Sequence, residues 1–198
     1  MNVAVVDYGT GNLHSLVKAL EKDGVQVWVE ADLVRALLAD AIVLPGVGAF
    51  GDAAAHLAPG VEALHHAIAQ GKPCLGICLG MQLLFDASEE GPGRGVSALS
   101  GTTRRLAGRR VPHMGWNDVE MMDDPLFAGM SQLVAYYANS FVVDPSDDSE
   151  VIAWSRYGRE RFPAAVRRDN VWGVQFHPEK SGAAGLQVLN NFIAQVAA

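Results

Sequence analysis

The 198-residue chain predicts an α/β fold, with a central, mostly parallel sheet flanked by helices on both faces and a more antiparallel, strand-rich second half. In the first half, short apolar runs alternate with helical segments, an order that favours parallel strands joined by crossover helices. Strand patterns dominate the second half. No linker, repeat or low-complexity tract interrupts the chain, so we expect residues 1–198 to form one domain.

The first half contains short apolar or β-branched runs, typical of strands buried in a parallel sheet. Between them, apolar residues recur at helical spacing. Gly24 follows the first helical segment as a C-cap, and Gly60 predicts a break in the longest one. We expect strands over residues 3–7, 25–30, 41–44 and 72–77, and helices over residues 12–23, 32–39, 53–70 and 81–88.

The second half contains further strand patterns separated by polar turns. It closes with an amphipathic segment whose apolar residues recur at helical spacing. We expect strands over residues 96–106, 109–119, 133–143, 151–157, 164–168 and 171–176, and a helix over residues 185–197.

Composition excludes several classes of protein. A content of 49% hydrophobic and 19% charged residues excludes a disordered chain. The net charge of −7 repels phosphate backbones, which argues against sequence-independent nucleic-acid binding. No apolar run approaches the ~18 residues of a membrane helix, and the first seven residues lack the basic segment of a signal peptide. We therefore expect a cytoplasmic protein that binds neither nucleic acid nor membrane.

The clearest candidate site is the run G-I-C-L-G around Cys78, between a predicted strand and a predicted helix. It has the spacing of the G-x-S-x-G nucleophile elbow, with cysteine as the nucleophile. Such a bend strains the backbone of the nucleophile and needs small flanking residues, here Gly76 and Gly80. The helix N-terminus would favour the thiolate, and the Leu79 N–H would face a developing oxyanion. The alternative is that Cys78 is a small buried hydrophobe, the role that we assign to Cys74.

A thiol nucleophile needs a base, usually a histidine oriented by a third group. His177 ends the last predicted strand, at the carboxyl edge of a parallel sheet where ligands bind. Pro178 favours an extended backbone at His177, so Glu179 would face the same way and orient the imidazole. The sequence thus predicts a Cys78–His177–Glu179 triad. The alternative is an ordinary edge histidine beside a loop-capping glutamate.

A second oxyanion element is predicted at Pro45-Gly46-Val47-Gly48, directly after the strand at residues 41–44. Its two glycines would let a backbone N–H face the site, although a plain glycine turn is the alternative. The stretch after the first strand lacks the third glycine of a dinucleotide-binding loop, and H-P-E lacks the P-C-x-x-C of zinc deaminases. We therefore expect no metal and no cofactor.

The stretches G-I-C-L-G-M-Q (76–82) and H-P-E (177–179) together resemble the class I, triad-type glutamine amidotransferases. Further stretches are similar to one branch of that family, the glutaminase subunits of imidazole glycerol phosphate synthases. The most discriminating is P-H-M-G-W-N, which sister amidotransferases lack. The stretches are D-Y-G-T-G-N-L (7–13), L-P-G-V-G-A-F (44–50), P-H-M-G-W-N (112–117) and F-H-P-E-K-S (176–181).

The resemblance implies hydrolysis of glutamine to glutamate and ammonia through a thioester on Cys78. His177 would protonate the leaving ammonia and later activate water, and Glu179 would orient His177. Further residues would form the oxyanion hole and hold the α-carboxylate and α-amino end of glutamine. The implied oxyanion residues are Leu79, Gly46, Val47 and Gly48, and the implied substrate contacts are Gln82, Glu90, Ser140 and Phe141.

The resemblance also implies a heterodimer, because the ammonia would pass to a separate cyclase subunit of the (β/α)₈-barrel type for imidazole ring closure in histidine biosynthesis. Asn12, His113, Trp116 and Asn117 would lie at or near that interface.

The chain departs from the family at one informative place. The family usually has H-S-Y where this chain has Asn139-Ser140-Phe141. The imidazole and the tyrosine hydroxyl are lost, but contacts through the backbone of Ser140 and Phe141 would survive. The alternative functions are the glutaminase subunit of another synthase, directed to chorismate or a purine precursor, and a non-catalytic regulatory domain of the same fold.

Overall fold

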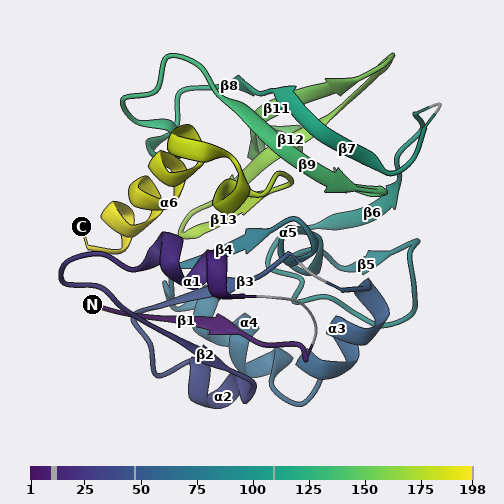
Figure 1. The fold of residues 1–198 in the computed structure, drawn as a ribbon. Coiled ribbons are helices and arrows are strands. Elements are labelled where there is room, and N and C mark those ends of the chain that lie inside the picture. Colours follow the sequence, from purple (N-terminus) through teal and green to yellow (C-terminus); the bar gives the residue numbers. More distant parts are fainter. Residues whose placement is uncertain (10–12, 47, 109, 198) are drawn as a thin grey trace.

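The computed structural model of the chain describes residues 1–9, 13–46, 48–108 and 110–197. An eight-stranded mixed sheet forms its centre (Figure 1). The strands are β1 (Asn2–Val6), β2 (Gln26–Glu30), β3 (Ala41–Leu44), β4 (Cys74–Ile77), β8 (Glu120–Met121), β11 (Val151–Tyr157), β12 (Glu160–Arg168) and β13 (Val171–Val174). Their order is β2-β1-β3-β4-β13-β12-β11-β8. The first five are parallel neighbours and the last three pair antiparallel, which confirms the predicted fold class.

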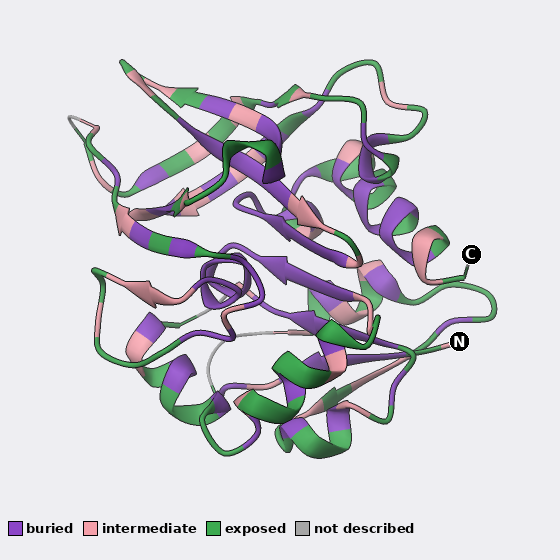
Figure 2. Ribbon diagram, turned by 180° about the vertical axis from the view of Figure 1, so that it is seen from behind, coloured by how far each residue is buried: buried purple, intermediate pink, exposed green. Residues whose placement is uncertain are grey.

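Helices cover both faces of this sheet, because alternate residues of its buried strands point to opposite sides. In β1, Val3 and Val5 point to the face that α1 and α6 cover, whereas Ala4 and Val6 point to the face that α2, α3, α4 and α5 cover. These helices are α1 (His14–Leu20), α6 (Gly182–Val196), α2 (Leu33–Ala36), α3 (Phe50–Leu57), α4 (Val61–Ala69) and α5 (Leu79–Leu83). Figure 2 shows the central strands buried and the helices exposed along one side. No helix among the described residues has the length and apolarity to cross a membrane.

Two small sheets, built mostly from the second half, and three short 3₁₀ helices complete the described part of the chain. One sheet pairs β7 with β9, and the other has the order β10-β6-β5. The strands are β5 (Ala87–Ser88), β6 (Gly101–Arg105), β7 (His113–Asp118), β9 (Val134–Asn139) and β10 (Phe141–Pro145). The 3₁₀ helices are η1 (Pro125–Phe127), η2 (Asp148–Glu150) and η3 (Pro178–Lys180).

The strand expected over residues 133–143 is wrong in one respect, because it is two strands that separate at Ser140. β9 pairs with β7, whereas β10 pairs with β6. The Ser140 carbonyl accepts a hydrogen bond from the Leu106 N–H at 3.0 Å, so the chain changes partner at this residue. Apolar alternation continues across the change, and the pattern alone therefore does not reveal it.

The helix expected over residues 81–88 is also shorter than predicted, since α5 ends at Leu83. A later loop takes the carbonyls that a longer helix would need: Val96 donates to Leu83 at 2.7 Å, and Leu99 donates to Leu84 at 3.0 Å. The break predicted at Gly60 is confirmed, because α3 ends before it and α4 begins after it.

Glycines allow α5 to pack directly against the sheet. A Cβ added at Gly76 would lie 2.5 Å from the Gly80 carbonyl oxygen, as the elbow pattern requires. A Cβ at Gly80 would lie 1.9 Å from the carbonyl oxygen of Leu44 in β3, so this glycine is needed for the contact with β3 rather than with Gly76. Backbone therefore packs on backbone at the start of α5.

We expect Gly80→Ala to lower the free energy of unfolding by about 3 kcal/mol or more, because the Leu44 carbonyl belongs to a buried strand that cannot move aside. Urea unfolding of the full chain measures this. Gly91→Ala is the matched control: its Cβ would meet its nearest neighbour, the Gly51 nitrogen, at 3.4 Å, and we expect a change within about 0.5 kcal/mol. Equal unfolding midpoints for the two variants would contradict this account of the packing.

Candidate active site

Cys78 lies on the bend between β4 and α5, where the elbow pattern places it. Its φ of 51° and ψ of −103° fall in a region that L-residues rarely adopt, because Cβ crowds the neighbouring backbone. The Cys78 N–H donates to the Val174 carbonyl in β13 at 2.7 Å. Neighbouring strands thus hold the bend, and the strain is confined to the residue that carries the sulfur.

His177 reaches Cys78 because β4 and β13 are parallel neighbours. Val174 lies opposite Ile77 in the register of these strands, so the chain leaves both at the same edge of the sheet. The imidazole interacts with the Cys78 side chain, and both residues approach Gly46. Both residues are buried, with 3% of His177 and 6% of Cys78 exposed. The structure therefore brings these two predicted site residues together from distant parts of the sequence.

Hydrogen bonds on both sides fix the orientation of His177. Its backbone N–H donates to the Tyr136 carbonyl at 2.8 Å, and Ser181 Oγ donates to the backbone carbonyl of His177 at 2.6 Å. Nδ1 lies 2.9 Å from Glu179 Oε1, which leaves Nε2 for the sulfur. Glu179 arrives on the 3₁₀ turn η3 and not on the extended segment that we expected, because Pro178 opens that turn.

Opposing effects set the protonation of His177. Burial by itself would lower its pKa, but hydrogen bonds to Cys78 and Glu179, together with the negative charge of these partners, outweigh burial. The net result raises the pKa of His177 from 6.5 to about 10. The site thus favours an imidazolium beside the sulfur at neutral pH, an arrangement suited to donating a proton to a leaving group.

Gly46, the first residue of the predicted oxyanion loop, packs against both members of this pair. A Cβ at this position would lie 2.6 Å from the Ile77 carbonyl oxygen, 2.8 Å from Cys78 Cβ and 3.1 Å from His177 Cε1. Only glycine lets the loop pass this close. The loop after β3 therefore forms one wall around the sulfur, made of main chain.

Of the remaining oxyanion predictions, Leu79 directly follows Cys78. Leu79 opens α5, where the first N–H groups of a helix have no acceptor within the helix. Gly48 has a φ of 105°, a conformation that glycine adopts readily. Val47 lies outside the described residues.

The residues expected at the α-end of glutamine fall into two groups. Gln82 is buried, and its Nε2 donates to the Phe141 carbonyl at 3.1 Å, so the structure brings Gln82 to Ser140 and Phe141. Glu90 instead accepts a hydrogen bond from the Phe50 N–H at 2.9 Å, at the start of α3. The first group adjoins β10, and Glu90 adjoins the helix that follows the Gly46 loop.

Two further amide side chains contact this network, Asn139, noted in the sequence as a departure from the family, and Gln175, which the pattern did not single out. Asn139, which replaces the family's usual histidine, donates through Nδ2 to the Phe141 carbonyl at 3.0 Å. Gln175 is fully buried, and its Nε2 lies 3.5 Å from Cys78 Sγ. A signal was present in the sequence, because Gln175 is a lone polar residue inside the apolar run that leads to His177.

The β7–β9 ribbon carries three of the four predicted interface residues, His113, Trp116 and Asn117. Trp116 is 59% exposed and Met114, on the same face, is 65% exposed. Tyr136 of β9 lies opposite Trp116, and their rings meet edge to face at 6.1 Å. These three side chains, which we call the ribbon face, form an exposed apolar surface. Asn12 lies outside the described residues.

His113 and Asn117 lie beneath the ribbon face. His113 is 3% exposed and stacks between Tyr137 at 4.8 Å and Tyr157 at 4.1 Å. Burial lowers its pKa, which favours the neutral imidazole. The half-buried Asn117 donates through Nδ2 to the Arg156 carbonyl at 3.0 Å. His113 therefore supports the ribbon from below and does not itself offer a surface for a partner.

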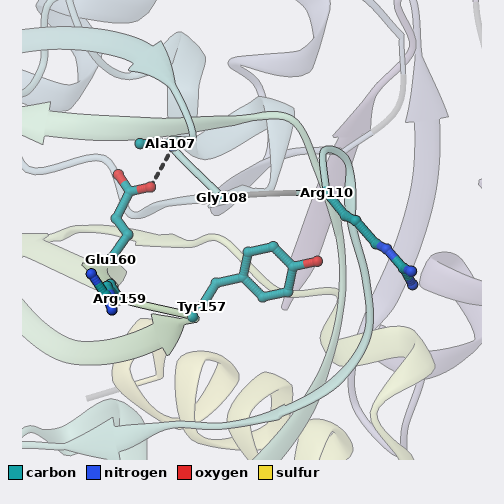
Figure 3. A pocket seen from close by; sticks show the side chains of 7 residues that line it. Ala107, Gly108, Arg110, Tyr157, Arg159 and Glu160 are labelled. Carbon is teal, nitrogen blue, oxygen red and sulfur yellow. Dashed lines mark hydrogen bonds between the residues drawn. The ribbon is translucent and has the colours of Figure 1, made fainter.

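An open cleft of about 1020 Å³ lies elsewhere, next to the turn between β11 and β12. Figure 3 shows the Tyr157 ring near Gly108, and Arg110 and Glu160 also line the cleft. None of the predicted catalytic side chains lines this cleft. Its size alone does not connect it with the chemistry at Cys78.

The side chains around Cys78 can support acyl transfer from an amide. A thiol, a histidine that carries a proton, an orienting carboxylate and a glycine-rich wall of backbone lie at one edge of the sheet. These are the parts that a covalent thioester mechanism requires.

Comparisons with known proteins agree with this chemistry. The model of the family "Glutamine amidotransferase class-I" matches residues 4–196. A relative from Synechococcus elongatus, named imidazole glycerol phosphate synthase subunit HisH, is 47% identical over 204 residues, covering 99% of this chain and 94% of its own. Proteins of the same name from Halobacterium salinarum and Methanothermobacter thermautotrophicus are each 46% identical, covering 97% and 96% of this chain and 92% and 97% of their own.

Solved structures share the fold at lower identity. A glutamine amidotransferase aligns with a TM-score of 0.78 at 19% identity, covering 99% of both chains. PurLQS from Thermotoga maritima aligns with a TM-score of 0.71 at 24% identity, covering 98% of both chains. Together with the family match over nearly the whole sequence, these findings show that the chain belongs to the class I glutamine amidotransferase family.

Proposed function

We propose that this chain is the glutaminase subunit of an imidazole glycerol phosphate synthase, which hydrolyses glutamine and passes the ammonia to a cyclase subunit. The observation that carries the proposal is the contact of Cys78 with the His177–Glu179 pair. The identity of 46–47% to HisH proteins over nearly the full chain supports this synthase over those directed to chorismate or a purine precursor.

In the first half of the reaction, the Cys78 thiolate attacks the side-chain amide carbon of glutamine and forms a C–S bond. The N–H of Leu79 and the backbone of Gly46, Val47 and Gly48 stabilise the oxyanion. The C–N bond then breaks as His177 gives its proton to the nitrogen, which leaves as ammonia. A glutamyl thioester remains on the sulfur.

In the second half, the now neutral His177 takes a proton from water, and the resulting hydroxide attacks the thioester carbon. The C–S bond breaks, which releases glutamate and restores the thiolate beside the imidazolium. Glu179 keeps Nδ1 engaged throughout, so that Nε2 faces the reacting atoms. Gln82, Glu90 and the backbone of Ser140 and Phe141 hold the α-end of the substrate.

The partner that we propose is a cyclase subunit of the (β/α)₈-barrel type, which docks on the ribbon face. Exposed Met114 and Trp116 provide the apolar anchors that protein interfaces favour. The backbone carbonyl of Tyr136, in the same ribbon, accepts the N–H of His177 at 2.8 Å. A partner on this face would therefore sit beside the site where ammonia is released, with Asn12 and Asn117 at or near the interface and His113 supporting the ribbon beneath it.

We also propose that residues 1–198 act as a single amidotransferase domain in the cytoplasm. The family match spans residues 4–196, and the steps above use only side chains, backbone and water.

Cys78→Ala tests the proposed nucleophile. In the complex with the cyclase subunit, we expect glutamine-dependent synthesis to fall by roughly 10³-fold or more, because no other group forms the thioester. Synthesis from added ammonium should persist. Cys74→Ala is the matched control, since Cys74 is fully buried four residues earlier in β4, and it should retain glutamine-dependent synthesis. Wild-type glutamine turnover by Cys78→Ala would refute the mechanism.

Glu179→Gln tests the charge on His177. Glu179 raises the pKa of His177. Replacing its carboxylate by the neutral amide of glutamine should therefore lower that pKa, so that the imidazolium loses its proton at a lower pH. We expect the alkaline limb of kcat for glutamine hydrolysis to move to lower pH. Protonated His177 stabilises the fold fully below pH 6.5, and this contribution is lost as the pH rises through about 10, so Glu179→Gln should also reduce stability at neutral pH.

The pH profile and urea unfolding measure these two effects. Glu120→Gln, in a surface pair with Arg161, is the control and should change neither. An unmoved alkaline limb in Glu179→Gln would mean that another group sets it.

Trp116→Ala tests the ribbon face. We expect binding to the cyclase subunit to weaken by about 30-fold, the effect of losing a central aromatic anchor. Isothermal titration of the two full-length subunits measures this. Leu38→Ala is the control, because Leu38 is 82% exposed on the segment after α2 and should leave the affinity unchanged. Equal affinities of wild type and Trp116→Ala would place the interface elsewhere.

A further inference from the structure

We propose that Gln175 is a positioning residue for Cys78, which donates a hydrogen bond to the sulfur and connects it to the backbone that holds glutamine. Its consequence for turnover rests on the proposed glutaminase function. Its effect on the sulfur itself can be measured without glutamine.

Gln175 occupies a fully enclosed place between β13 and His177. Its side chain is 0% exposed, as are its neighbours Val174 and Phe176. A buried carboxamide must find hydrogen-bond partners inside the protein, because an unsatisfied one costs free energy. Within the part of the chain that the structure describes, the Gln175 side chain has two hydrogen-bond partners: Cys78 Sγ, 3.5 Å from Nε2, and Gln82 Nε2, 3.4 Å from Oε1.

The orientation of this carboxamide follows from a neighbouring carbonyl. The Phe141 carbonyl can only accept, so Gln82, at 3.1 Å, must present its Nε2 there. The second hydrogen on the same Nε2 is then directed to Gln175, which must present its oxygen. The Nε2 of Gln175 is left facing Cys78. One backbone acceptor thus fixes two side-chain amides in series.

The consequence for the sulfur is that it must be the acceptor. A carboxamide nitrogen has no lone pair to accept a thiol proton, so any proton on Sγ has to point away from Gln175. His177 is the other hydrogen-bond partner of Cys78, and the proton is therefore directed to the base. When the proton has moved, the Gln175 N–H remains as a donor to the thiolate and stabilises its charge.

The same series of amides ends at the substrate site that we propose. The Phe141 carbonyl accepts from both Gln82 and Asn139, which holds the backbone of residues 140–141 in place. A shift of this backbone when glutamine binds would pass through Gln82 to Gln175 and so to the sulfur. Gln175 thus joins the α-end contacts to the nucleophile.

The experiment measures the rate at which iodoacetamide modifies Cys78 in the full chain between pH 5 and 10, with the modified peptide identified by mass. For Gln175→Met, which keeps the length but loses the donor, we expect about a tenfold lower rate at pH 7 and a half-maximal rate about one pH unit higher. Gln175→Glu should reduce the rate further, because a carboxylate repels the thiolate. In glutamine hydrolysis by the complex, kcat should fall more than KM rises.

Gln187→Met is the matched control, because Gln187 lies on α6 and its side chain donates a hydrogen bond to Asn191 Oδ1 at 2.8 Å, away from the sulfur. It should keep the wild-type profile. A wild-type modification profile in folded Gln175→Met and Gln175→Glu would overturn the inference. If neither variant folds, as judged by thermal melting, Gln82→Met decides, since it removes the donor that orients Gln175: a slower, shifted profile supports the proposal and an unchanged one refutes it.

These outcomes are separate from the test of the proposed function. A wild-type complex that does not hydrolyse glutamine refutes the function, whatever the modification profile shows. A wild-type complex that hydrolyses glutamine, with Gln175 variants that behave like wild type, refutes only the role of Gln175.

Discussion

The parallel pairing of β4 with β13 is the constraint on which the candidate site depends. Val174 lies opposite Ile77, and a shift of this register by one residue would turn the following side chains to the opposite face. Cys78 would then lose its contact with His177. The backbone bond from the Cys78 N–H to Val174 ties the bend to the same strand pair. Sheet register therefore determines whether a thiol and an imidazole from distant parts of the chain can react together.

Two cysteines, one at the start of β4 and one directly after its end, show how strongly position decides chemistry. Burial raises the pKa of Cys74 to about 12, so that its thiol stays protonated and serves as a small apolar side chain. Cys78 lies four residues later, on a strained bend beside His177 and Gln175. Among the described residues, His177 can take the proton of Cys78 and Gln175 can stabilise its charge. The residue type is the same, and the surroundings make one of them a candidate nucleophile.

The sequence allowed much of the fold to be predicted, because buried strands and the elbow have strong local patterns. The strand at residues 41–44, the break at Gly60 and the position of the bend at Cys78 have signals in the adjacent sequence. The strand change at Ser140, the burial of His113 and the contact of Gln175 with the sulfur depend on partners far along the chain. Local spacing carries no information on such partners, so these features emerged only from the structure.

The glycine-lined centre also has a consequence for how such a protein can change over generations. Gly46, Gly76 and Gly80 are positions where even one added methyl would strike main chain or the reactive pair. We expect substitutions at these places to disrupt the fold, whereas substitutions in the exposed ribbon around Trp116 leave the packing intact and act on partner binding. Sequence differences between related enzymes should therefore be concentrated in the partner-binding surface. The same reactive centre can then be inherited by enzymes that bind different partners.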